Sequence, residues 1–295
     1  MYENAFYEYL SSEKRYSVHT VLAYQTDLKQ FHEFLENNYE IRNPAEVSPS
    51  IIRTWITDLM ELKISPRSIN RKLSTLKTFY RFLRKNGHVK SSPLEQIVPP
   101  KTNKRLPEFV NEEKMDLFLN EEIFSDDFTG LRNRLVIELL YNTGMRLSEL
   151  TNLKTVDIDL TKCELKVLGK RNKERIIPFN NSLAIHIGEY MKKRSSAIEE
   201  EYDNKYLLLT AKGKNFYPKL VYRIVNSYLS KVSTLKKKSP HVLRHTFATH
   251  MLNNGADLNA IKEILGHANL AATQVYTHNT IENLKKVYKQ AHPRA

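Results

Sequence analysis

Cysteine is almost absent from this sequence. The 295 residues contain a single cysteine, Cys163, so neither a disulfide within the chain nor a cysteine-rich zinc module can form. Cys163 stands in the alternating run CELKV, which predicts a strand residue without a reactive role. The small disulfide-linked folds and the folds stabilised by cysteine-rich zinc sites are therefore excluded.

Long apolar runs are absent as well. No stretch approaches the roughly 18 consecutive apolar residues that a membrane-spanning helix needs. The opening MYENAFYEYL carries two glutamates and no lysine or arginine, unlike the basic start of a secretory signal. With 41% hydrophobic and 27% charged residues, the composition is typical of a soluble globular protein. We expect a cytoplasmic location and no membrane partner.

Acidic residues are scarce relative to basic ones. Lysine and arginine number 46 against 33 aspartates and glutamates, which gives a formal net charge of +13 and a pI near 9.5. This excess predicts a polyanionic partner, with a solvated basic surface as the alternative. The imbalance is concentrated, because no acid occurs between Glu61 and Glu95, where the sequence has nine lysines and arginines.

The middle of that acid-free stretch, 67–85, has the pattern of an amphipathic helix. A helix of about 19 residues fits the DNA major groove, where its cations neutralise phosphates; a solvated helix face is the alternative. The apolar stripe at helical spacing consists of Ile69, Leu73, Leu76, Tyr80 and Leu83. The candidate DNA-binding residues of this helix are Arg67, Arg71, Lys72, Lys77 and Arg81.

Two domains and a linker are expected. Residues 1–97 have the pattern of several helices separated by turns such as RNPAEVSPS and KISPRS, without a convincing strand. Residues 98–107, VPPKTNKRLP, hold three prolines and three cations, so they cannot continue a helix and predict an extended linker. The cations of this linker, which are further DNA-binding candidates, are Lys101, Lys104 and Arg105.

The second domain, 108–295, is predicted to be mostly helical with a small antiparallel sheet. The run VDIDLTKCELKVLGKRNKERIIPF alternates apolar and polar residues over two or three short strands, joined by the polar turn GKRNK. A helical pattern precedes it in FTGLRNRLVIELLYNTG and stops at Gly144, and further helical patterns follow from Lys219 onward.

Three histidines and an arginine crowd the stretch HVLRHTFATH, 241–250. His241 and His245 are four residues apart and share one helix face, as a pair of zinc ligands does. No glutamate of the HExxH kind accompanies them, and the fixed charge of Arg244 repels a metal ion and attracts an anion. We therefore expect a phosphate site here and no metal.

Five segments of the second domain carry a recognisable pattern: TGMRLSEL at 143–150, GKRNKER at 169–175, HVLRH at 241–245, LGH at 265–267 and YTH at 276–278. In this order and at these intervals they resemble the motifs of the tyrosine recombinase family. The chain length, the helical leading domain and the ending AHPRA are similar to the Xer branch of that family. The resemblance implies a two-domain DNA clamp, with a helical core-binding domain at 1–97 and a tyrosine recombinase catalytic domain at 108–295.

The resemblance also implies a catalytic set without metal or cofactor. Two arginines clamp the phosphate, because planar guanidiniums match phosphate geometry and offset the charge that develops during attack. One of the sixteen tyrosines, Tyr276, is then the nucleophile that forms a covalent 3′-phosphotyrosine. The implied catalytic residues are Arg146, Lys170, His241, Arg244, His267 and Tyr276.

The assignment of Lys170 leaves one alternative open. The resemblance places it in the turn between two strands, as the group that protonates the departing 5′-oxygen. Arg171 stands where many relatives have glycine, and Lys173 is close enough in the sequence to compete for the same role. Arg171 and Lys173 are also candidate DNA-binding residues.

The implied partner is double-stranded DNA with paired half-sites, bound by a homo- or hetero-tetramer that includes another recombinase, with a DNA translocase as candidate activator. The implied process is chromosome dimer resolution, and integration of mobile elements is the alternative. Type IB topoisomerase-like cleavage and a non-catalytic, sequence-specific DNA-binding protein also remain open. We expect the apolar stripe of the last helix to dock on a neighbouring protomer; it consists of Ile281, Leu284, Val287 and Tyr288.

Overall fold

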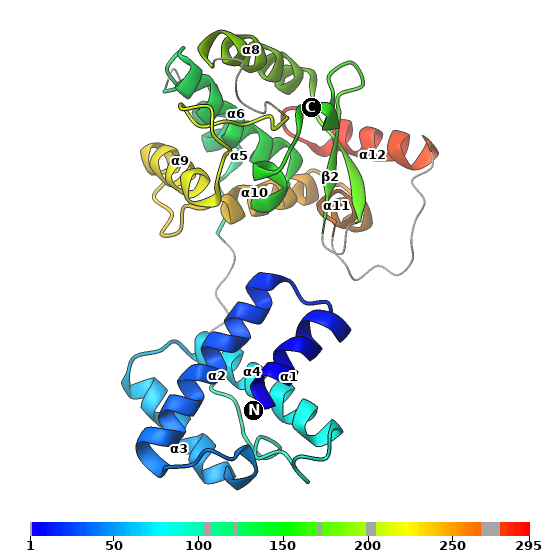
Figure 1. Ribbon diagram of the computed structural model, residues 1–295. Coiled ribbons are helices and arrows are strands. Elements are labelled where there is room, and N and C mark those ends of the chain that lie inside the picture. Colours follow the sequence, from blue (N-terminus) through cyan, green and yellow to red (C-terminus); the bar gives the residue numbers. More distant parts are fainter. Residues whose placement is uncertain (1, 103–107, 121–122, 170–172, 199–204, 267–277) are drawn as a thin grey trace. The chain divides into compact units, whose positions relative to one another are not determined.

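The computed structural model describes residues 2–102, 108–120, 123–169, 173–198, 205–266 and 278–295. The chain divides into two compact units, Met1–Arg105 and Leu106–Ala295 (Figure 1). The division falls within the proline-rich segment 98–107. No helix among the described residues is long and apolar enough to cross a membrane.

The described residues of the first unit, unit 1, form helices joined by turns and loops, and none of them lies in a strand. Two of its helices begin at a serine whose side chain accepts a backbone N–H: Ser17 caps α2, and Ser65 caps α4, where Pro66 follows at the first helical position. The α-helices of unit 1 are α1 (Tyr2–Glu8), α2 (Val18–Tyr39), α3 (Pro49–Glu61) and α4 (Pro66–Lys85), with a π-helical turn at Tyr9–Glu13 and a 3-10 turn at Pro44–Glu46.

Helix α4 confirms the amphipathic pattern of the acid-free stretch. All five residues of its apolar stripe are at most 1% exposed, and they pack with aromatic side chains of α1, α2 and α3 such as Phe6, Phe31 and Trp55. The opposite face of the helix leaves Arg67, Lys77 and Arg81 exposed.

The structure corrects the prediction for Lys72. Its side chain is only 7% exposed, and its ammonium group lies 3.1 Å from the carboxylate of Asp27, which is itself fully buried on α2. A cation held inside the helical core cannot reach a DNA phosphate. Arg71 also bonds to Asp27, but its side chain is 52% exposed and remains accessible from outside.

The second unit, unit 2, combines helices with one small sheet, as the sequence predicts. The sheet has the order β1-β2-β3 with both pairs antiparallel, and Leu165 lies opposite Ile177 on its buried face. The strands are β1 (Ile158–Asp159), β2 (Glu164–Leu168) and β3 (Glu174–Pro178). The α-helices are α5 (Glu112–Asn120), α6 (Phe128–Thr143), α7 (Leu147–Thr151), α8 (Asn181–Ala197), α9 (Pro218–Val232), α10 (Pro240–Asn253), α11 (Leu258–Leu265) and α12 (His278–Ala291).

Cys163 does not lie in a strand. It occupies the turn directly before β2 with φ +52°, a left-handed conformation that the chain needs to reverse between β1 and β2. The alternating pattern of CELKV is correct for the four residues after the cysteine, so the interpretation placed the strand one residue too early.

Helix α6 forms the centre of unit 2 and packs against α8, α9 and α10. It ends at Gly144, whose φ of +58° suits glycine. A Cβ at this position would lie 2.5 Å from the ring of Phe247 on α10. The close approach of these two helices therefore also requires glycine, and it fixes the chain immediately before Arg146.

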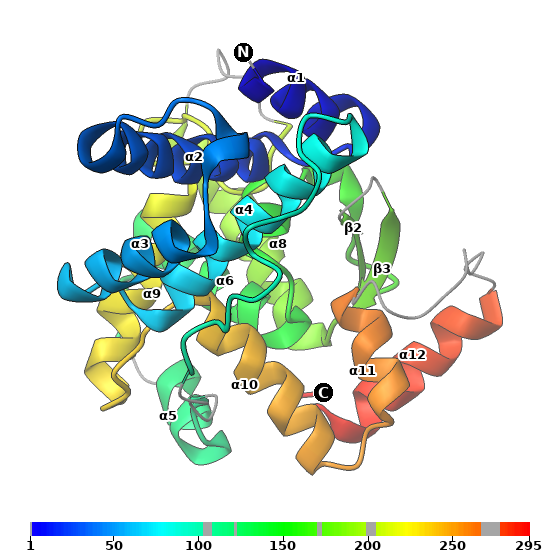
Figure 2. The same ribbon diagram turned by 90° about the horizontal axis from the view of Figure 1, so that it is seen from below.

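Helix α12 packs on its own unit. Figure 2 shows it beside α10, α11 and the sheet. Leu284, Tyr288 and Ala291 are at most 3% exposed, and the ring of Tyr288 stacks on His292 with centroids 4.8 Å apart. Of the predicted stripe, Leu284 and Tyr288 are thus covered by the same chain, whereas Ile281 and Val287 are only partly buried, and docking on a neighbouring protomer stays a prediction.

Candidate functional site

Arg146 is positioned by the start of α7. It is the N-cap of that helix, and its backbone N–H donates to Glu149 Oε2 at 2.7 Å. Its guanidinium donates to Glu149 Oε1 at 2.8 Å and to the carbonyl oxygen of Gly266 at 2.5 Å. The helix start thus holds both the backbone and the side chain of this arginine, whose side chain stays 26% exposed.

Arg244 comes from α10 and approaches the same place. Its guanidinium donates to the carbonyl oxygen of Gly144 and, at 2.7 Å, to that of Leu265. Burial and the neighbouring charges of Arg146 and Arg175 lower its pKa to about 10, a value at which it remains charged at neutral pH. The two arginines that the resemblance assigns to the phosphate are therefore brought together.

Helix α10 is itself anchored at the far side from Arg244. Thr246 Oγ1 accepts the backbone N–H of Val110 at 3.0 Å, and His250 Nε2 lies 2.8 Å from the carbonyl oxygen of Val110, to which it donates. The other ring nitrogen of His250 then accepts from the hydroxyl of Tyr141 at 3.0 Å. These contacts fix the rotation of the helix that carries Arg244.

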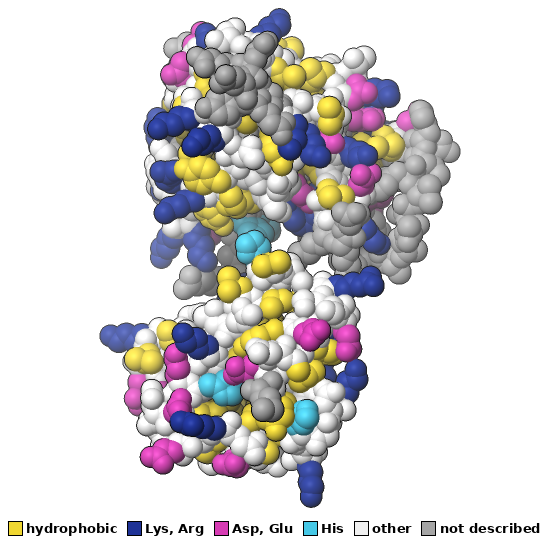
Figure 3. Space-filling model, viewed as in Figure 1, with side chains coloured by type: hydrophobic (Ala, Val, Ile, Leu, Met, Phe, Trp, Pro, Cys, Tyr) yellow, Lys and Arg dark blue, Asp and Glu magenta, His cyan; other side chains and the backbone are white. Residues whose placement is uncertain are grey.

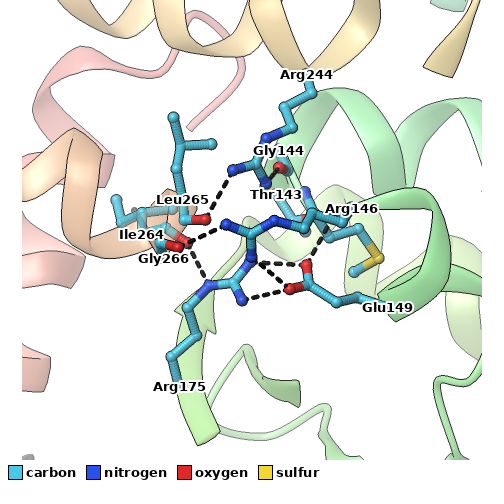
Figure 4. A network of polar contacts seen from close by, with 10 residues as sticks. Thr143, Gly144, Arg146, Glu149, Arg175, Arg244, Ile264, Leu265 and Gly266 are labelled. Atoms are coloured by element: carbon cyan, nitrogen blue, oxygen red, sulfur yellow. Dashed lines mark hydrogen bonds and ion pairs between the residues drawn. The ribbon is translucent and has the colours of Figure 1, made fainter. Parts of the chain in front are cut away.

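The carboxyl end of α11 is the point on which the arginines converge (Figure 4). The carbonyl oxygens of Ile264, Leu265 and Gly266 each accept a hydrogen bond from a different guanidinium, the first of them from Arg175 at 2.7 Å. Carbonyls at a helix end have no partners inside the helix and carry partial negative charge, so cations stabilise them. The end of α11 immediately precedes His267 in the sequence.

The interpretation of the sequence missed two residues of this network, Glu149 and Arg175. Burial alone would raise the pKa of Glu149, but the hydrogen bonds and charge of Arg175 and the hydrogen bonds of Arg146 outweigh it and lower the pKa to about 2. Signals for both were present: Glu149 follows Arg146 by three residues at a helix start, and Arg175 shares the inward face of its strand with Ile177.

Two histidines of α10, His241 and His245, lie in its first two turns. His241 is exposed, whereas His245 is partly buried, and burial together with the charge of His241 lowers its pKa. Within the described part of the chain, no group of three or more histidine, cysteine, aspartate or glutamate side chains is placed to hold a metal ion. His241 shares α10 with Arg244, three residues later.

Several predicted site residues lie outside the described residues. Among those that are described, Lys173 has an exposed side chain and its carbonyl oxygen accepts the N–H of Gly169 at 2.7 Å, which closes the turn between β2 and β3. Lys101 is exposed in unit 1. Those outside the described residues are Lys104, Arg105, Lys170, Arg171, His267 and Tyr276.

Unit 2 has a basic surface that the sequence analysis did not single out. Figure 3 shows lysine and arginine side chains gathered on the side of unit 2 where α9 lies. The exposed cations of α9 and of the segment that follows it are Lys219, Arg223, Lys231, Lys236 and Lys237. Such a surface is suited to a polyanion.

Two family models match the sequence. The model described as phage integrase family matches residues 108–283, and the model described as phage integrase, N-terminal SAM-like domain, matches residues 4–87. The first match contains Arg146, Arg244 and the other four residues that the resemblance assigns to catalysis. The second contains helix α4.

Curated relatives match over nearly their full length. The tyrosine recombinase XerC of Chlorobaculum tepidum is 40% identical over 314 residues, covering 98% of this chain and 94% of the relative. The tyrosine recombinase XerC of Oceanobacillus iheyensis is 39% identical over 298 residues, covering 100% of this chain and 97% of the relative.

Solved structures share the fold. The XerA recombinase is 30% identical with a TM-score of 0.50, covering 100% of this chain and 99% of the other. The XerH site-specific recombinase, bound to a palindromic difH substrate in a post-cleavage complex, is 22% identical with a TM-score of 0.73. The match covers 92% of this chain and 76% of the XerH chain. The Tn1549 transposon integrase with transposon right end DNA is 19% identical with a TM-score of 0.73. The match covers 97% of this chain and 98% of the integrase chain.

Proposed function

Because the chain belongs to the phage integrase family, within the Xer branch of the tyrosine recombinases, we propose that it cleaves and rejoins duplex DNA at specific sites through a covalent 3′-phosphotyrosine. The observation that carries the proposal is the convergence of Arg146 and Arg244 on the end of α11. From that end the chain runs on to His267 and Tyr276.

The arginine cluster supplies the charge that this chemistry needs. The cluster contains three guanidiniums and the single carboxylate of Glu149, so its formal net charge is +2. Attack on a phosphodiester adds negative charge to its non-bridging oxygens, and cations fixed before the reaction stabilise that charge without reorganisation. Arg146 and Arg244 are the two that hold these oxygens, and His241 and His267 add donors or transfer protons.

Strand cleavage then follows as a transesterification. The hydroxyl of Tyr276 gives its proton to one of the two histidines, and its oxygen attacks the phosphorus. A tyrosine–phosphate bond to the 3′ side forms, and the bond to the 5′-oxygen breaks. Lys170 gives a proton to the departing 5′-oxygen. A 5′-hydroxyl from a partner duplex reverses the same steps, so the strands exchange without an external energy source.

Binding of the duplex is shared by the two units. The exposed cations of α4 and the basic segment 98–107 contact one part of the DNA, and unit 2 contacts another, so that the two units form a clamp on it. Each protomer occupies one of two inverted half-sites, and two bound duplexes bring four protomers together, of this chain alone or with another recombinase. We infer that this activity takes place in the cytoplasm and serves chromosome dimer resolution. A DNA translocase is the proposed activator.

Two assays test this function. The chain is first incubated in excess chelator with a nicked duplex that carries a site selected from random DNA by binding. We expect a covalent protein–DNA adduct with the wild type and none with Tyr276→Phe, at equal DNA affinity. The absence of any wild-type adduct would leave a non-catalytic DNA-binding protein.

The second assay uses a supercoiled plasmid with two copies of the selected site. We expect two product circles, because rejoining uses the 5′-hydroxyl of the partner duplex. Relaxation of the plasmid without resolution, also after addition of a partner recombinase, would show a type IB topoisomerase-like activity instead.

A further inference from the structure

Arg175 is a buried arginine that the mechanism above uses only for its share of the charge of the cluster. It lies on β3, and its side chain is only 4% exposed. Desolvating a guanidinium is costly unless hydrogen bonds and an opposite charge compensate for it. The partners of Arg175 therefore indicate what the residue does.

The guanidinium of Arg175 makes a bidentate ion pair with Glu149. Its Nη1 donates to Glu149 Oε1 at 2.6 Å and its Nη2 to Glu149 Oε2 at 2.8 Å. Each of the two carboxylate oxygens is shared with Arg146, one with its side chain and the other with its backbone N–H. Arg175 thus holds the carboxylate that orients Arg146.

The third contact of Arg175 joins β3 to the end of α11. Its Nε donates to the carbonyl oxygen of Ile264, and its side chain lies so close to Gly266 that a Cβ there would be 3.1 Å from the guanidinium. Gly266 also has φ +64°, a left-handed conformation that suits glycine. The turn that leads out of α11 is therefore built against Arg175.

The strand that carries Arg175 is also paired with β2, the strand that precedes Lys170 in the sequence. Glu174, the neighbour of Arg175, pairs with Leu168 at the end of β2, two residues before Lys170. One side chain thus connects the strand hairpin, the start of α7 and the end of α11. Each of these three elements contributes or directly precedes a residue of the proposed catalytic set.

We propose that Arg175 is a positioning residue for strand cleavage: through Glu149 it fixes the guanidinium of Arg146, and through the carbonyl of Ile264 it fixes the end of α11. The inference rests on the proposed function. Arg175 does not touch DNA, because its side chain is buried and its donors point to Glu149 and Ile264. Lysine cannot replace it, because an ammonium group lacks the planar fork that spans both carboxylate oxygens.

Three variants separate positioning from charge. Arg175→Met removes the contacts and one charge, and Arg175→Lys removes the fork but keeps the charge. The double variant E149Q/R175M lacks the ion pair but keeps the net charge of +2. We expect all three to bind the selected duplex with wild-type affinity and to cleave it more slowly, Arg175→Met by on the order of 100-fold, as small misplacements of catalytic groups do.

Arg194→Met is the matched control. Arg194 is also a buried arginine of unit 2 that donates to backbone carbonyls, those of Tyr206 at 2.9 Å and Leu207 at 3.0 Å. We expect Arg194→Met to lower the thermal unfolding midpoint but to cleave at the wild-type rate at a temperature where it is folded. Wild-type cleavage by folded Arg175→Met, or rescue by Arg175→Lys, would overturn the proposal.

A substrate with altered charge shows whether Arg175 acts through Arg146. In a methylphosphonate, a methyl group replaces one non-bridging oxygen of the scissile phosphate and removes its negative charge, so attack depends less on the guanidinium clamp. We expect the defects of Arg175→Met and Arg146→Ala both to shrink at least tenfold on this substrate. An undiminished defect of Arg175→Met would overturn the role assigned through Arg146.

The wild type is assayed beside every variant. If the wild type forms no adduct with Tyr276, the proposed function fails before Arg175 is tested. If the wild type forms the adduct and Arg175→Met forms it equally fast, the inference alone fails.

Discussion

The guanidinium of Arg146 lies 2.8 Å from the carboxylate of Glu149, three residues later in the chain. That carboxylate is buried and is shared with Arg175. One acid thus keeps two cations in fixed positions beside the end of α11, and a change at Glu149 is expected to affect both stability and catalysis.

The low pKa of Glu149 predicts an acid-dependent stability. Its folded pKa of about 2 lies below the ordinary value of 4.5, so the contribution is complete above pH 4.5 and is lost as the pH falls toward 2. The loss amounts to roughly 3 kcal/mol. Urea unfolding at pH 5 and pH 3 is expected to show a smaller difference for Glu149→Gln than for the wild type, and an equal difference would contradict the assignment.

His292 predicts a second pH dependence, which extends closer to neutrality. Burial lowers its pKa to about 3 from 6.5, among Tyr141, Tyr288, His250 and Arg294. The neutral ring is therefore the folded form, and stability falls as the pH drops below 6.5 toward 3, by up to about 1.4 kcal/mol per pH unit. His292→Phe keeps a stacked ring and is expected to lose this part of the slope in urea unfolding between pH 7 and pH 4. The same slope in both proteins would refute the prediction.

The exposed face of α4 predicts a salt-dependent contribution to DNA binding. Reversing the charges of Arg67, Lys77 and Arg81 is expected to weaken binding at all sequences and to flatten the plot of log affinity against log salt concentration, by roughly one unit per lost contact. Lys72→Met is the control. Since Lys72 is buried against Asp27, its loss is expected to lower stability and to leave the salt slope unchanged. If the triple variant shows the same salt dependence of DNA affinity as the wild type, the exposed face of α4 is a solvated surface that does not bind DNA.

The roles of Lys170 and Lys173 can be distinguished by changing the leaving group of the substrate. An alkoxide needs a proton to depart, because the pKa of its conjugate acid is comparable to the roughly 15.7 of water, whereas a thiolate with a pKa of about 8.5 does not. Lys170→Ala is expected to cleave ordinary DNA very slowly and to approach the wild-type rate when sulfur replaces the bridging 5′-oxygen. Lys173→Ala is expected to show no such rescue. The reverse pattern would assign proton transfer to Lys173.

Periodicity in the sequence was sufficient for the elements but not for their contacts. The stripe of α4 and the β2–β3 hairpin follow from spacings of 3.6 and 2, which burial on one face imposes locally. The burial of Lys72 depends on Asp27, 45 residues earlier, and the pairing of Arg175 with Glu149 spans 26 residues. Such pairs are set by how helices and sheet pack, which local patterns do not contain. Motif spacing named Arg146 and Arg244, but not Glu149 and Arg175, which hold Arg146 in place.

The central claim is that Tyr276 carries the DNA, and mapping of the covalent adduct tests it most directly. Tyr288, the nearest tyrosine after it in the sequence, is 3% exposed and stacked on His292, so it cannot reach a phosphate without unfolding of α12. The adduct from a nicked duplex is digested with a protease and a nuclease, and the nucleotide-bearing peptide is sequenced by mass spectrometry. We predict a nucleotide joined through its 3′-phosphate to the oxygen of Tyr276. The same group on Tyr288 or on any other residue would contradict the account.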